Sequence, residues 1–198
     1  MPSAEVAIET LELLWRNYLT LAENVDLESM DPQIVANHVA RKSPVRPFRI
    51  AAWLGRQAFF LAAWSLWEHY TSELCDSLPT QVRKAKGDSH VNWVMKNLTP
   101  NNLPFTDHEW FGNANCLRNL FAHHGGRAVE SRAHNLLQRS RKAFPNIEMY
   151  TDGYVAVDHC HVADFELKIE NFIEEIAQQD RSTVPTGALR LTPSGPVT

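Results

Sequence analysis

Residues 116–125 read CLRNLFAHHG, which is the most informative segment of the sequence. Its apolar residues recur at steps of three and four positions, which is typical of the buried face of an amphipathic helix. Thr106 or Asp107 can cap the start of that helix, and Gly125 followed by Gly126 is typical of a helix end. We therefore predict a helix that begins near residue 107 and stops at the two glycines.

The same stretch carries three polar residues, Arg118, Asn119 and His123, near the predicted helix end. Asn119 and His123 share a helix face, and the long Arg118 side chain can fold back to that face. An imidazole can give or take a proton near neutral pH, and a guanidinium suits a phosphate group. Because RNA supplies its own nucleophile, the 2′-hydroxyl, this set predicts RNA cleavage without a metal ion. The alternative is a solvated helix face on which His123 only caps the helix end.

The polar trio resembles the Arg-x(4–6)-His motif of HEPN domains, in the Arg-Asn-x-x-x-His form of HEPN ribonucleases, which it matches one for one. The stretch WEHY at 67–70 is similar to an aromatic-Glu-x-Tyr element in the second helix of small standalone HEPN proteins. A closing helix at 162–176 is also usual, so the resemblance covers roughly residues 50–178. It implies a mainly α fold, an antiparallel bundle of four to six helices.

The HEPN resemblance also implies an activity. HEPN ribonucleases are metal-independent and need no cofactor, and they pair motifs from two domains, which implies a homodimer with a composite cleft. His123 would act as general acid or base, Arg118 would stabilise charge and Asn119 would position the phosphate or the histidine, giving a 2′,3′-cyclic phosphate. Many relatives are toxins of toxin–antitoxin or phage-defence systems, so an antitoxin protein is an expected partner beside RNA. Other HEPN domains are non-catalytic interaction modules or bind nucleotides, and these functions are the alternatives.

Further residues are assigned supporting roles around the motif. Glu68 lies among aromatic residues, where a buried carboxylate needs a partner, so we predict that it orients Arg118; an exposed strip of the helix is the alternative. His124 is assigned at most a secondary role. Five basic residues after the motif are predicted to hold RNA phosphates, unless they form an ordinary solvated face: Arg127, Arg132, Arg139, Arg141 and Lys142.

The remaining chain is interpreted as one helical domain, residues 1–180, followed by a flexible tail at 181–198 that is rich in Thr, Pro, Gly and Ser. Asp152-Gly153 between apolar residues predicts a small β-hairpin near 146–157. Apart from the motif helix, the other helices are predicted over 4–22 (packing on the core), 33–41, 48–78, about 91–98, 128–144 and 162–176.

Composition limits the function and the setting. A net charge of −4 argues against broad coating of DNA or an anionic membrane, so any RNA contact must use a local basic patch. Three widely spaced cysteines, Cys75, Cys116 and Cys160, favour a reducing, cytoplasmic setting. The longest nearly apolar stretch, 58–67, is about half of a membrane span. The sequence His-Cys-His at 159–161 does not have the spacing of a tetrahedral site, so no metal is predicted.

Overall fold

The computed structural model describes residues 3–23, 47–149 and 153–183. The chain there is mainly helical with one small antiparallel pair of strands, which confirms the predicted fold class. The helix predicted over 33–41 lies outside the described residues. The elements are, in order, α1 (Ala4–Glu23), α3 (Pro47–Ser77), α4 (His90–Leu98), the 3-10 helix η1 (Thr99–Asn101), α5 (His108–His124), α6 (Ser131–Ser140), β1 (Glu148–Met149), β2 (Val155–Ala156) and α7 (His159–Thr183).

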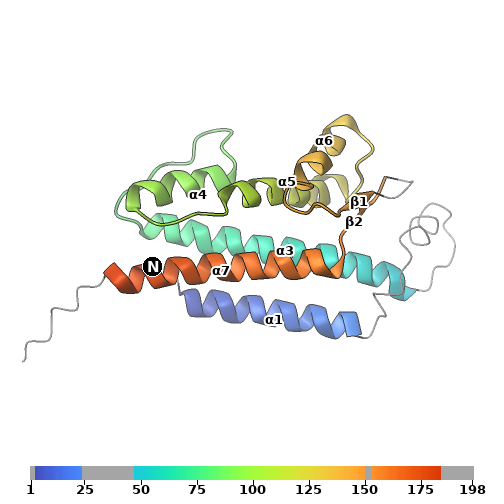
Figure 1. The fold of residues 1–198 in the computed structure, drawn as a ribbon, viewed down its shortest axis with the longest axis horizontal. Helices are drawn as coiled ribbons and strands as arrows, with labels where there is room; N and C mark the ends of the chain where they lie inside the picture. Colours follow the sequence, from blue (N-terminus) through green and yellow to red (C-terminus); the bar gives the residue numbers. More distant parts are fainter. Residues whose placement is uncertain (1–2, 24–46, 150–152, 184–198) are drawn as a thin grey trace, which may run out of the picture.

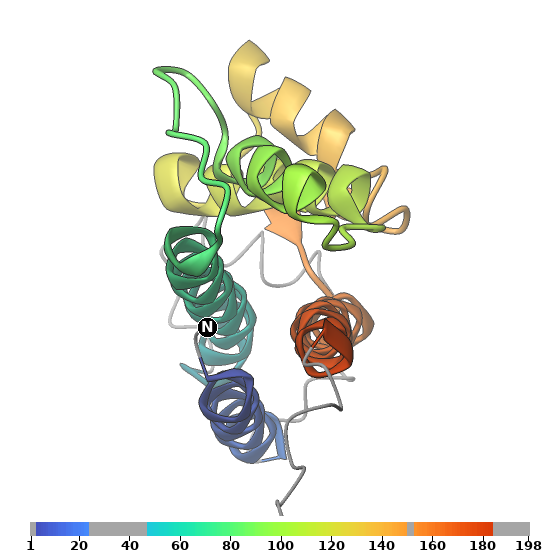
Figure 2. The same cartoon turned by 90° about the vertical axis from the view of Figure 1, so that its left-hand side faces the viewer.

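The long helices α1, α3 and α7 lie side by side, and α4 and α5 lie over α3 and α7 on the side away from α1 (Figures 1 and 2). α6 packs on α5, at the opposite end of the molecule from α4 (Figure 1). The hairpin follows α6, with Glu148 opposite Ala156 and Met149 opposite Val155. α3 is therefore the central helix, in contact with α1, α4, α5 and α7.

The core is built on the aromatic residues of α3. Phe60, Trp64 and Trp67 have no exposed surface, because neighbouring helices cover this helix on several sides. The Phe60 ring stacks on Phe165 of α7 at 4.1 Å between centroids, and Trp67 stacks on Phe111 of α5 at 4.8 Å. Burial of each such side chain contributes about 1.5–3 kcal/mol. These contacts fix α5, and with it the polar trio, against the centre of the bundle.

The predicted end of α5 is confirmed, and its start differs in detail. Gly125 has a left-handed φ of 54°, and its N–H donates to the carbonyl of Leu120, so the helix stops at the first glycine. At the other end, Asp107 occupies the N-cap position without a capping hydrogen bond from its side chain. Its carboxylate instead accepts from Lys168 Nζ of α7 at 2.9 Å, which ties the start of α5 to α7.

α6 and α7 begin and end at other residues than the sequence predicts. α6 is shorter than 128–144, because the N–H of Ala128 donates to Gly153 at 2.7 Å and holds this segment against the hairpin. α7 begins earlier than residue 162, since the N–H of Asp158 donates to Nδ1 of His161 at 3.0 Å, the pattern of a capping box. α7 also continues to Thr183, beyond the start of the predicted tail.

Gly153 offers a test of the hairpin. Its φ is 85°, a left-handed conformation, and a Cβ there would collide with the Val129 side chain. Gly153→Ala is therefore expected to lower the free energy of unfolding by about 1–2 kcal/mol. Gly112→Ala in α5 is the control, because its Cβ would meet open space and alanine favours a helix by about 0.5–1 kcal/mol. Urea denaturation measures both; equal stabilities of the two variants would contradict the expected strain.

Candidate active site

The Arg118 guanidinium is held by two neighbouring side chains. Nη2 lies 3.3 Å from Oε2 of Glu68 on α3, and Nη1 donates to Oδ1 of Asn119 at 3.0 Å. The Arg118 and Glu68 side chains are each 28 % exposed, so the pair lies at the surface of the α3–α5 contact. A guanidinium has five N–H donors and these contacts use only two, which leaves donors for a phosphate.

His123 and His124 lie in the last turn of α5, apart from that pair. The His123 side chain is exposed and makes no hydrogen bond or ion pair within the part of the chain that the structure describes. His123 follows Arg118 by five positions, so their Cα atoms lie about 7.5 Å apart along the helix axis. Nδ1 of His124 lies 4.0 Å from the Glu130 carboxylate, at the start of α6. A phosphate that uses both Arg118 and an imidazole must therefore bridge them, within one chain or across two.

A third histidine, His90 of α4, stands beside the Arg118–Glu68 pair and was missed in the sequence. Its Nε2 lies 2.7 Å from Oγ1 of Thr71, a fully buried hydroxyl on α3 that also lies 2.7 Å from the carbonyl of Trp67. The tautomer of the imidazole sets which of Nε2 and Oγ1 donates in this hydrogen bond.

The charge state of His90 reflects the same neighbours. Burial lowers the pKa of His90 to about 4; the charges of Lys84 and Arg118 act in the same direction, while Glu68 opposes them. The imidazole is thus neutral at physiological pH. A sequence signal existed, because Ser89 caps α4, its hydroxyl accepting from the N–H of Asn92 at 3.2 Å. That signal places His90 at a helix start but not beside Arg118, which is a tertiary contact.

The five basic residues predicted to hold RNA are not equivalent. Arg132, Arg139 and Lys142 are exposed. Arg141 donates from Nε to the carbonyl of Ile147 at 3.3 Å, and the Arg127 guanidinium lies over the Tyr154 ring at 5.3 Å. The last two side chains therefore help to hold the segment between α6 and the hairpin.

Cys116 in α5 and His161 at the start of α7 are explained by roles in packing and in helix capping. Burial raises the pKa of the Cys116 thiol, so a nucleophilic thiolate is disfavoured there. Asp158, Cys160 and His161 bring possible metal-ligand atoms within 4.8 Å of one another. Nδ1 of His161, however, already accepts the Asp158 N–H, and this contact stabilises the start of α7.

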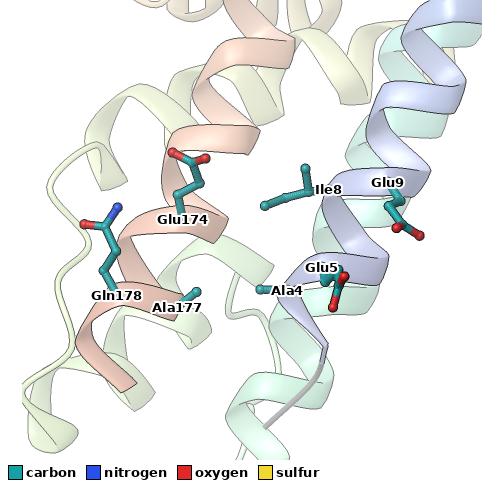
Figure 3. A pocket seen from close by; sticks show the side chains of 7 residues that line it. All are labelled: Ala4, Glu5, Ile8, Glu9, Glu174, Ala177 and Gln178. Atoms are coloured by element: carbon teal, nitrogen blue, oxygen red, sulfur yellow. The ribbon is translucent and has the colours of Figure 1, made fainter. Parts of the chain in front are cut away.

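A groove of about 430 Å³ runs between the start of α1 and the end of α7 (Figure 3). The Ala4 and Ile8 side chains point across it toward α7, and the carboxylates of Glu5, Glu9 and Glu174 stand among its lining residues. Three carboxylates repel phosphate, so this groove is a poor site for RNA.

Among the described residues, no helix combines the length and the apolar character needed to cross a membrane. Comparison with protein-family models, with curated proteins and with solved structures found no match to this chain.

Proposed function

We propose that this chain is a metal-independent endoribonuclease of HEPN type. The observation that carries the proposal is the Arg118 guanidinium, held by Glu68 and Asn119 at a half-exposed position on the helix that ends with His123. A permanent cation with unused donors stabilises a phosphorane-like transition state, and a nearby imidazole moves the proton. The same two groups do not require a bound cofactor.

The proposed reaction uses the nucleophile that RNA carries. His123 takes the proton of a 2′-hydroxyl, the 2′-oxygen attacks the adjacent phosphorus, and the bond to the 5′-oxygen breaks. Arg118 stabilises the charge that develops on the non-bridging oxygens, and Asn119 keeps the guanidinium in place. A proton returned to the leaving oxygen completes the step, giving a 2′,3′-cyclic phosphate and a 5′-hydroxyl.

The HEPN resemblance implies a homodimer, in which Arg118 of one chain and His123 of the other act on the same phosphate. In that assembly the exposed ends of two α5 helices face each other. A toxin regulated by an antitoxin protein, of a toxin–antitoxin or phage-defence system, is the biological role consistent with such an enzyme.

The test is RNA cleavage in the presence of EDTA. Purified chain should cut single-stranded RNA and leave 2′,3′-cyclic phosphate ends, which mass spectrometry identifies. The matched substrate carries one 2′-deoxy nucleotide at the cleavage position and should stay intact there, because the nucleophile is missing. A chain that leaves varied RNAs uncut, or that cuts the deoxy-substituted position equally well, would contradict the proposal.

A further inference from the structure

The loop between α3 and α4 carries three cations, Arg83, Lys84 and Lys86, all with exposed side chains. Residues 79–87 contain no Asp or Glu. The next acidic residue, Asp88, is already engaged, because both its carboxylate oxygens accept from Lys96 Nζ at 2.9 Å. The loop therefore carries an excess of positive charge, of which Asp88 offsets only a part, although the chain as a whole is acidic.

This loop is pinned to α4. Asn97, which is 1 % exposed, accepts from the N–H of Val82 at 2.7 Å and donates to its carbonyl at 3.0 Å. The indole N–H of Trp93 donates to the same carbonyl at 2.7 Å. In the same way, the side-chain amide of Asn101 accepts from the N–H of Thr80 and donates to its carbonyl. These contacts fix the backbone immediately before the cations, so less conformational freedom is lost when a ligand binds.

The pinned loop continues into the Arg118 site. Nζ of Lys84 lies 5.8 Å from the centroid of the half-buried Trp93 ring. The Trp93 ring in turn lies 5.2 Å from His90, and the charges of Lys84 and Arg118 both act on that imidazole. The cations of the loop, an indole and the Arg118 guanidinium thus follow one another over α4 and α5. α6, which carries the exposed cations Arg132 and Arg139, lies at the other end of α5 from α4 (Figure 1).

We propose that this loop is a binding track for single-stranded RNA, which leads the phosphate backbone over Lys84 to Arg118. The inference rests on the proposed function and adds the path of its substrate. Three exposed cations close together in the chain suit consecutive phosphates, and an indole beside an ammonium group is a combination that binds unstacked bases. The exposed bases of a single strand can reach Trp93, whereas those of a duplex are stacked and paired.

The test measures binding and cleavage with the same variants. Binding is followed by fluorescence anisotropy of a labelled 2′-O-methyl oligoribonucleotide, which cannot be cleaved, in EDTA over a range of salt concentrations. The loop variant combines Arg83→Gln, Lys84→Gln and Lys86→Gln. It is expected to raise Kd by about tenfold or more at low salt, and to reduce the slope of log K against log salt by about 2. Its kcat should be retained while KM rises.

Three further variants sharpen the result. Arg16→Gln removes one cation from α1, where Arg16 pairs with Glu12, and should bind like the wild type, whereas Lys84→Gln alone should bind more weakly. The rival RNA-binding surface, on and just after α6, is tested by one variant, the α6 variant, which combines Arg132→Gln, Arg139→Gln and Lys142→Gln. A chain that cuts RNA, and in which the α6 variant loses binding while the loop variant does not, overturns the track but leaves the proposed function standing. A wild-type chain that neither binds nor cuts RNA overturns both.

Discussion

Replacement of His123 by alanine is expected to slow RNA cleavage by about 10²–10⁴-fold, the usual effect of removing one acid–base group. The loss should come without unfolding, because the side chain is exposed and holds no other described residue. Arg118→Ala should reduce the rate by about 10²–10³-fold, through loss of charge stabilisation. Single-turnover rates at saturating RNA measure both, and thermal melts of the same samples check the fold.

Glu68→Gln separates orientation from charge stabilisation in the same assay. The amide can still accept a hydrogen bond from Arg118, so the guanidinium keeps its place but loses its ionic partner. We expect a smaller fall in rate than for Arg118→Ala. A Glu68→Gln chain as inactive as Arg118→Ala would instead assign the carboxylate a direct part in proton transfer.

Mixing the two inactive chains tests whether the site is shared. If Arg118 of one chain works with His123 of the other, half of the randomly formed dimers are mixed and each contains one intact site. About a quarter of the wild-type activity should then return when His123→Ala and Arg118→Ala chains are exchanged. A site formed within one chain gives no recovery. Normal cleavage by both single variants would remove the proposed mechanism altogether.

Much of the fold followed from local signals in the sequence. α3 was predicted because its apolar residues surround the helix, and the structure buries Phe60, Trp64 and Trp67 completely. The end of α5 was predicted because a left-handed glycine stops a helix, and Gly125 does so. Both signals act within a few residues of chain, so neighbours far away in sequence do not change them.

The parts that were not predicted depend on contacts between distant residues. Ala128 bonds to Gly153 across the hairpin, which delays the start of α6, and no local pattern announces that pairing. Asp107 was a reasonable capping residue, but Lys168 of α7 engages its carboxylate. His90 belongs to the same class, because a half-buried imidazole becomes part of the site only when α4 packs against α3 and α5.

In the candidate site, too, the local features were predicted and the contacts that depend on side-chain direction were not. The spacing of Arg118, Asn119 and His123 placed all three on one predicted helix, and Glu68 was considered as a partner for Arg118. The sequence could not show that Arg118 and His123 make no contact within a chain, since that depends on the direction of each side chain. The role of a second protomer, or of a bridging phosphate, is therefore the central question about the proposed active site.

Acidification is expected to destabilise the fold through His90. The pKa of this imidazole is lowered to about 4 by burial, with Lys84 and Arg118 adding to the effect against Glu68, whereas the unfolded chain has the ordinary value near 6.5. The stability contributed by the neutral ring is complete above pH 6.5 and is lost as the pH falls from there toward 4. Because the ring is partly exposed and solvent screens its neighbours, the loss is only a part of the roughly 3 kcal/mol that the full pKa shift corresponds to. Burial also lowers the pKa of His161, which adds a change of the same sign.

The His90→Gln variant measures how much of the pH dependence of stability comes from His90. The glutamine Nε2 can still donate to the Thr71 hydroxyl, but the side chain does not titrate between pH 4 and 7. Urea denaturation at pH 7, 6, 5 and 4.5 should show a shallower loss of stability for this variant than for the wild type. His69→Gln is the control, because His69 is exposed and pairs with Glu73 on the surface of α3. If the free energy of unfolding falls equally with pH in wild type and His90→Gln, protonation of His90 does not destabilise the folded chain. The imidazole would then not be held neutral beside Arg118.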